Sequence, residues 1–245
     1  MPTAVAVSEQ GARARMEDYH TLDFDSGESG SVFGGVYDGH SGNSAARHAA
    51  EFLHVYFFDF LRAGLPPATA FQAAYLKISR DLENQPSGTT AATFFIDEGL
   101  IHAANAGDSR ILVVREEGET QLSVDHRVDN PEEMKRIKLS GGEINYPYVV
   151  KGSSGLMPTR ALGDEYFRDI GVISVPSVCS REIGPSDLWL VAASDGLFDV
   201  IDNRETAGIC RLHTDPFRLA ETLVGEIAER SLAPDNITII LVKFP

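Results

Sequence analysis

The order of the apolar runs along the chain limits the fold more than any other feature of the sequence. Strand-like runs occur at 5–7, 19–24, 31–37, 89–96, 100–105, 110–115, 188–193 and 237–242. Apolar residues recur at helical spacing within 42–62, 68–82 and 216–230, and a short helix should begin after Asn130 and end before Gly141. Because strands and helices occur in separate groups, this order predicts an α+β fold with helix layers on antiparallel sheets, and argues against a doubly wound parallel fold.

The stretch from Asn145 to Gly171 does not fit either periodicity. It is rich in glycine and aromatic residues, the composition of a loop that carries function. We expect an irregular, flexible border of an active site there, and within it residues 146–155 are the predicted place of substrate choice.

Charge and cysteine content exclude several classes of protein. The formal net charge of −15 argues against binding to nucleic acid or to an anionic membrane surface. Either the acids serve solubility, or some of them converge on hard cations. Cys179 and Cys210 are too few for a disulfide framework. We expect free thiols in a cytosolic or nuclear, not secreted, protein, folded as one domain over 1–245, monomeric and without regulatory segments.

Aspartates at the ends of apolar strands are the strongest chemical signal. Asp38-Gly39-His40 follows one such run and Asp195-Gly196 follows another, while Asp108 lies in a turn and Asp235 precedes the last strand. A carboxylate in such a place is costly unless it is paired or binds a metal. Taken alone, Asp38 could equally be a helix cap in a turn.

Two further motifs are weaker. Arg13 to Asp18 contains two arginines and two adjacent acids, which on their own indicate a solvated salt-bridge cluster. Ser87-Gly88-Thr89-Thr90 lacks the lysine and the glycine spacing of a phosphate-binding loop. We interpret it as the start of a core strand.

Seven short motifs occur in one order across residues 13–236: Arg-x-x-Met-Glu-Asp, Asp-Gly-His-x-Gly, Ser-Gly-Thr-Thr-Ala, Gly-Asp-Ser-Arg, Thr-Arg-Ala-Leu-Gly-Asp, Ser-Asp-Gly-Leu-x-Asp and Asp-Asn. This order resembles the metal-dependent PPM (PP2C-type) serine/threonine protein phosphatases. The resemblance implies a four-layer αββα sandwich, with two antiparallel sheets flanked by helices, and phosphoserine or phosphothreonine proteins as substrates.

The resemblance also implies a binuclear centre of two Mn²⁺ or Mg²⁺ ions. Asp38 would bridge the ions, with Glu17 and the Gly39 carbonyl on one and Asp195 and Asp235 on the other. Oxygen ligands of this kind suit hard cations. The two ions would activate a water for direct attack on phosphorus, with no phosphoenzyme intermediate.

Five other residues receive roles only through the resemblance. Asp18 would hold a metal-bound water, and Asp108 with Asp199 would form a weaker third-metal site beside Asp195. Arg13 would bind the phosphoryl oxygens. His40 would protonate the leaving oxygen, or else only orient a water or Asp38.

Arg160 and Asp164 match a family motif, and we expect a local structural ion pair from them rather than a direct part in catalysis.

Two alternatives to an active protein phosphatase stay open. The chain could be a pseudophosphatase scaffold, although the residues proposed as ligands are present. It could also be a two-metal phosphomonoesterase acting on a small molecule.

Overall fold

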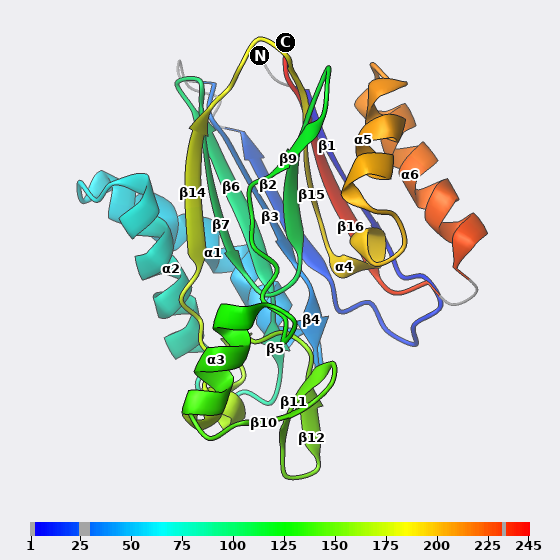
Figure 1. The fold of residues 1–245 in the computed structure, drawn as a ribbon. Coiled ribbons are helices and arrows are strands. Elements are labelled where there is room, and N and C mark those ends of the chain that lie inside the picture. The colour runs from blue at the N-terminus through cyan, green and yellow to red at the C-terminus, as the bar shows by residue number, and fades with distance from the viewer. Residues whose placement is uncertain (1–2, 25–29, 232–233) are drawn as a thin grey trace.

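Two five-stranded antiparallel sheets lie face to face in the computed structural model, which describes residues 3–24, 30–231 and 234–245 (Figure 1). The first sheet has the spatial order β1 (Thr3–Glu9), β16 (Ile237–Lys243), β15 (Asp187–Ala193), β8 (Arg110–Arg115) and β9 (Glu119–Gln121). The second has the order β14 (Ser177–Glu182), β7 (Leu100–Ala106), β6 (Ala91–Asp97), β3 (Val32–Tyr37) and β2 (Tyr19–Phe24).

Helices cover the outer face of each sheet. The second sheet is covered by α1 (Ser44–Arg62) and α2 (Pro67–Asp81), and the first by α4 (Asp195–Phe198), α5 (Asn203–Arg211) and α6 (Pro216–Arg230). The predicted four-layer αββα sandwich is therefore confirmed. Among the described residues, no helix combines the length and the apolar character that crossing a bilayer requires.

Both faces of each sheet are covered, and this explains why the central strands are continuous apolar runs in the sequence. In β6, Phe94 and Ile96 point into the core between the two sheets, whereas Phe95 points outward into the core beneath α1 and α2. In β16, Ile240 joins the core between the sheets and Ile239 joins the core beneath α6. Both alternating sets must be apolar because each strand is buried on both sides.

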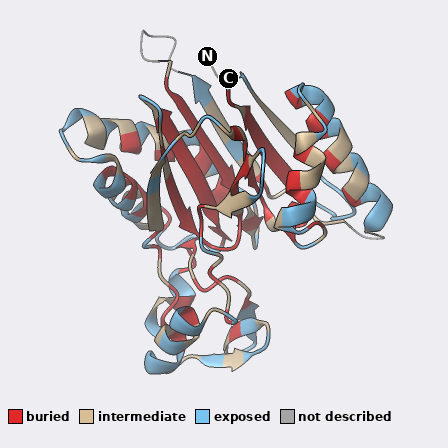
Figure 2. Cartoon of the chain, turned by 45° about the horizontal axis from the view of Figure 1, so that its top comes forward, coloured by how far each residue is buried: buried red, intermediate tan, exposed pale blue. Residues whose placement is uncertain are grey.

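A small lobe, here called the flap (residues 131–172), projects from one end of the sandwich (Figure 2). It contains α3 (Pro131–Leu139), β10 (Glu143–Asn145), β11 (Tyr148–Lys151), β12 (Ser154–Leu156), β13 (Leu162–Gly163) and the 3₁₀ helix η1 (Glu165–Ile170). Its core is formed chiefly by Ile137, Val149, Leu156, Phe167 and Val172, with Val128 from the preceding loop. As predicted, Asn130 caps α3 by accepting hydrogen bonds from the amides of Glu132 and Glu133.

The prediction of an irregular stretch over 145–171 is wrong in part. β10, β11 and β12 form a three-stranded antiparallel sheet that spans most of 143–156. These strands are only three or four residues long, so they are too short to show a period of two in the sequence. β14 and α5 also escaped prediction. β14 lies at a sheet edge and carries polar residues, and α5 is only nine residues long.

The remaining short strands connect the flap to the sandwich. β5 (Gly88–Thr89) pairs with both β4 (Gly39–His40) and β13. Ser87-Gly88-Thr89-Thr90 therefore leads into the core strand β6, as predicted, and also supports the strand that carries His40. Both cysteines are free thiols, as expected.

Candidate metal centre

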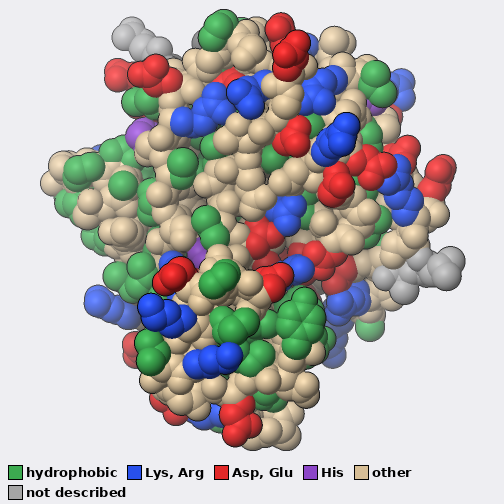
Figure 3. Space-filling model, viewed as in Figure 1, with side chains coloured by type: hydrophobic (Ala, Val, Ile, Leu, Met, Phe, Trp, Pro, Cys, Tyr) green, Lys and Arg blue, Asp and Glu red, His purple; other side chains and the backbone are tan. Residues whose placement is uncertain are grey.

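The acids predicted from strand ends meet at one end of the sandwich. Asp38 follows β3, Asp195 follows β15, Asp235 precedes β16, and Asp108 lies between β7 and β8. They line one cavity of about 590 Å³ together with Arg13, Glu17, Gly39 and His40. Acidic side chains are visible in the hollow between the sandwich and the flap (Figure 3).

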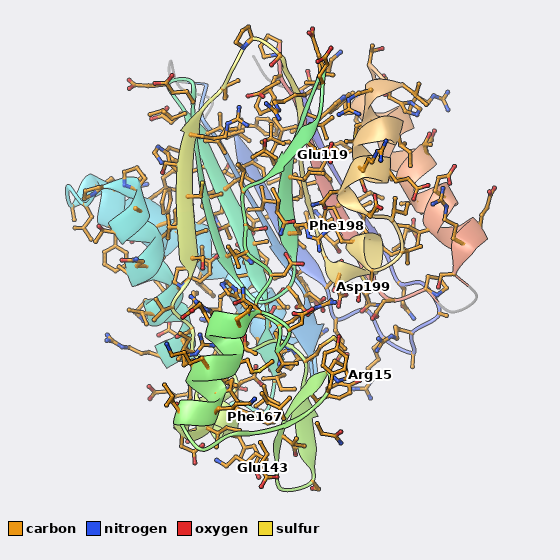
Figure 4. The ribbon with its side chains drawn as sticks, viewed as in Figure 1. Arg15, Glu119, Glu143, Phe167, Phe198 and Asp199 are labelled. Atoms are coloured by element: carbon orange, nitrogen blue, oxygen red, sulfur yellow. The ribbon has the colours of Figure 1, made fainter. Side chains whose placement is uncertain are left out.

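Asp18 and Asp199 border this cluster without lining the cavity. Asp18 is 4% exposed and accepts a hydrogen bond from the Ser194 hydroxyl at 2.8 Å. Its other oxygen, Oδ1, is buried and has no hydrogen-bond partner among the described residues. Asp199 directly follows α4, and its side chain is about half exposed (Figure 4).

The clustered carboxylates raise one another's pKa. Burial, followed by the charges of Asp18, Asp195 and Asp108, raises the pKa of Asp38 well above its ordinary value. Burial, followed by the charges of Asp108 and Asp199, raises the pKa of Asp195 to about 8. Burial also raises the pKa of Asp18 to about 6. The cluster therefore holds more negative charge than its surroundings stabilise.

Hard divalent cations fit this site. The available ligands are carboxylate and carbonyl oxygens, which Mg²⁺ and Mn²⁺ prefer. Oδ1 of Asp18 is a buried acceptor that has no hydrogen-bond partner in the described part of the chain. As the side chains stand, no three acidic, histidine or cysteine groups among the described residues surround a single point closely enough to hold an ion. Several of these carboxylates instead accept hydrogen bonds from protein groups.

The segment containing Arg13 and Glu17 is held against the cavity by Asn236. Its side-chain oxygen accepts from the Glu17 amide at 2.8 Å, and its nitrogen donates to the carbonyls of Gln10 and Arg15 at 2.7 and 3.0 Å. Gly39 permits a close approach of this segment, because a Cβ atom there would lie 2.4 Å from the Glu17 carbonyl oxygen.

Arg13 and Glu17 differ in their exposure to solvent and in their hydrogen-bond partners at the cavity. The Arg13 guanidinium is 62% exposed and donates to Asp235. Glu17 is less exposed, and its Oε1 accepts from the Gly42 amide at 2.6 Å. An exposed guanidinium that can exchange one carboxylate for another anion is suited to a phosphoryl group.

His40 is paired with Asp164, and this corrects the predicted ion pair. Nε2 of His40 lies 2.7 Å from Oδ2 of Asp164. Burial lowers the pKa of His40, but the charge and hydrogen bond of Asp164 outweigh burial and the pKa is raised. Within the described residues, Arg160 forms no hydrogen bond or ion pair with Asp164, and instead donates to Glu133 at 2.6 Å. The sequence motif suggested that Arg160 pairs with Asp164, whereas in the fold each residue pairs with a different partner.

Gly88 leaves room for the pair of His40 and Asp164. A Cβ atom at Gly88 would lie 2.0 Å from Oδ2 of Asp164 and 2.5 Å from Nε2 of His40. Asp164 itself has φ 52°, a left-handed conformation that Asp and Asn tolerate better than most residues. Asp164, which directly follows β13, thus places its carboxylate beside an imidazole from a distant part of the sequence.

Arg127 is the site residue that the sequence reasoning missed. It follows β9 in the loop before α3, and its guanidinium donates to Asp108, Asp195 and Asp199. The only sequence signal was a basic residue between Asp125-His126 and the cap of α3. A basic residue in a loop gives no indication of its partners.

The flap forms the opposite wall of the cavity. Tyr148, Ser154 and Gly155 line it, as predicted for residues 146–155, together with Tyr166 from η1. Tyr148 and Tyr166 are 43% and 54% exposed, so aromatic faces are available beside the carboxylates. This wall offers aromatic contact area to a molecule that enters the cavity.

Comparison with known proteins gives a consistent result. A protein-family model described as Protein phosphatase 2C matches residues 4–237. "Probable protein phosphatase 2C 59" of Arabidopsis thaliana is 32% identical, over 97% of this chain and 78% of that protein. "Probable protein phosphatase 2C 71" of the same plant is 31% identical over 97% of this chain, which spans 54% of that protein's length.

Solved structures show the same fold. A crystal structure of serine-threonine phosphatase 2C from Toxoplasma gondii has a TM-score of 0.85 with 23% sequence identity, covering 99% of this chain and 94% of that chain. A C. elegans sex determining protein also has a TM-score of 0.85 with 23% identity, covering 98% of this chain and 64% of that chain.

Proposed function

Because the chain belongs to the protein phosphatase 2C family, whose members are protein serine/threonine phosphatases, we propose that it hydrolyses phosphoserine and phosphothreonine in proteins by transferring the phosphoryl group directly to water. The observation that supports this most is the Asp38 cluster. Its mutually repelling carboxylates line a cavity, and such a cluster is suited to divalent cations rather than to protein cations alone.

Five groups would hold two Mn²⁺ or Mg²⁺ ions in this proposal. Asp38 would lie between them, Glu17 and the Gly39 carbonyl would serve one ion, and Asp195 and Asp235 the other. When bound, such ions lower the pKa of water and stabilise charge on the attacking and leaving oxygens. Asp18, whose buried Oδ1 is unpaired within residues 3–24, 30–231 and 234–245, would accept a hydrogen bond from the attacking water.

Arg13 and His40 would act on the substrate. Arg13 is exposed and bonded to Asp235, so its remaining N–H groups can bind phosphoryl oxygens. His40 would donate a proton to the departing serine or threonine oxygen. Since its Nε2 is committed to Asp164, the donated proton would come from Nδ1, with Asp164 holding the ring in place.

The test is hydrolysis of a phosphothreonine peptide and of p-nitrophenyl phosphate, with Mn²⁺, with EDTA and after Asp195→Ala. We expect peptide turnover with Mn²⁺ and loss of turnover under the other two conditions. Turnover unaffected by EDTA would contradict the metal requirement. Turnover of the small ester alone would favour a small-molecule phosphomonoesterase, and a folded protein inactive with several metals would favour a scaffold.

A further inference from the structure

Arg127 is a protein cation placed inside the carboxylate cluster. Its Nε donates to Oδ2 of Asp108 at 2.7 Å, and its terminal nitrogens donate to both oxygens of Asp199 at 2.9 and 3.0 Å and to Oδ2 of Asp195 at 3.2 Å. The Arg127 side chain is 22% exposed, and that of Asp108 is 3% exposed. Three carboxylates therefore hold one guanidinium in a partly desolvated place, where charge-assisted hydrogen bonds are strong.

The same oxygens would be needed by a weaker third divalent ion. Asp108 and Asp199, beside Asp195, are the residues that the family resemblance assigns to such an ion. A guanidinium has only N–H donors and no lone pair, so it cannot share in coordination. A divalent ion bound to these oxygens while the guanidinium remains would be repelled by it, because water screens the two positive charges poorly in this partly buried place.

We propose that Arg127 is a resident counter-cation of Asp108, Asp195 and Asp199, and that a third divalent ion binds only after the Arg127 side chain has left them. The inference rests on the proposed function for the identity of the first two ions. Of the groups assigned to those two ions, Asp195 accepts the longest of the four Arg127 hydrogen bonds, at 3.2 Å, and within the described residues Glu17, Gly39 and Asp235 accept none from it. Arg127 should therefore affect the third ion more than the first two.

The backbone around Arg127 connects the third ion to the flap. The His126 amide donates to the Gly107 carbonyl at 2.9 Å, and the Thr159 amide donates to the His126 carbonyl at 2.7 Å. Asn130, three residues after Arg127, caps α3 at the start of the flap. Departure of the Arg127 side chain would remove the charge-assisted hydrogen bonds that join the loop 125–130 to the carboxylate cluster.

Equilibrium dialysis with Mn²⁺ tests the proposal by counting bound ions rather than activity. Arg127→Met removes the charge and keeps a long apolar stem. We expect it to bind the third ion about 10-fold more tightly or better than wild type does, with a smaller gain for the tighter ion that Asp195 serves and none for the ion that Glu17 serves. Adding Asp199→Asn to Arg127→Met should abolish this gain. Arg230→Met is the matched control, because Arg230 also pairs with two carboxylates, Glu205 and Glu226, outside the cavity.

Identical Mn²⁺ isotherms for wild type and a folded Arg127→Met would overturn the proposal. If Arg127→Met fails to fold, hydrogen exchange of the wild type decides. Amides in 125–130 should exchange faster at the Mn²⁺ concentration that fills a third site than at the one that fills two, and equal exchange would overturn the inference.

Failure of the proposed function would be recognised separately. It would appear in the wild type as turnover that persists in EDTA, or as the absence of two tight Mn²⁺ ions. If the proposed function failed in this way and Arg127→Met still bound one more ion than wild type, the result would support the inference about Arg127 and not the proposed function.

Discussion

At the scale of single residues, the carboxylates that are suited to binding metal lower the stability of the metal-free protein. Asp195 is largely buried beside Asp108 and Asp199, and its pKa is raised to about 8 by burial first and by those charges second. A raised pKa means that the folded chain holds the proton more tightly than the unfolded chain does. Stability of the metal-free protein is therefore lost as pH rises from about 4 toward 8.

Replacing Asp195 by Asn should reverse this loss. In EDTA, we expect Asp195→Asn to match wild type near pH 4 and to exceed its unfolding free energy by roughly 1–3 kcal/mol at pH 8. Urea unfolding at several pH values measures the difference. Asp59→Asn, on the exposed side of α1, controls for the loss of one negative charge. A difference that does not grow with pH would refute the account of the cluster.

Asp164 is expected to act through His40. Asp164→Asn keeps a residue that tolerates the left-handed backbone at φ 52°, but removes the charge that faces the imidazole. We expect kcat for a phosphothreonine peptide to fall by roughly 10-fold or more, with Mn²⁺ binding unchanged. Asp169→Asn serves as control, because Asp169 pairs with Lys151 beside the same flap wall. Full activity of Asp164→Asn would exclude a role in orienting His40.

Only some residues of the candidate site could be predicted from the sequence. Aspartates at strand ends were recognisable because a buried strand that ends in an acid is unusual. Two partners were not recognisable: Arg127 for Asp108, and Asp164 for His40, which are 19 and 124 residues apart. Such pairs form because folding brings distant loops together, and neither composition nor periodicity predicts which loops meet.

At the scale of elements, the segment before β2 depends on one side chain from the start of β16. Asn236 bonds the Glu17 amide and the carbonyls of Gln10 and Arg15. β1 pairs with β16 along its whole length, so the segment that follows β1 begins beside Asn236. The cavity therefore receives Arg13 and Glu17 through contacts with the opposite end of the chain.

Asn236→Ala should detach this segment without unfolding the sandwich. We expect unfolding free energy to fall by roughly 1–3 kcal/mol, a higher Mn²⁺ concentration for half-maximal activity through Glu17, and a higher KM for phosphopeptide through Arg13. Asn203→Ala is the matched control, since Asn203 bonds Arg110 and Gln121 outside the cavity. Unchanged Mn²⁺ dependence in Asn236→Ala would show that Glu17 needs no such anchor.

Long elements were predictable and short ones were not. α1, α6 and β16 carry clear apolar periodicity or continuous burial. The flap strands β10, β11 and β12 are stabilised mainly by pairing with one another and by a small core around Ile137 and Val149. That stabilisation is tertiary, so the local sequence contains little of it.

At the scale of the whole molecule, antiparallel topology creates the site. Neighbouring strands of alternating direction bring the end of β3, the end of β15 and the start of β16 to one edge of the sandwich. The flap then closes one side of the resulting cavity. The sequence indicated acids at strand ends, but their convergence followed only from the family resemblance.

The most direct test of the metal centre is an anomalous difference map, measured at the manganese absorption edge, from crystals grown with Mn²⁺. We expect two strong peaks on either side of Asp38, one near Glu17 and the Gly39 carbonyl and the other near Asp195 and Asp235. Catalytically active crystals with no peak within bonding distance of Asp38 would contradict the proposed centre.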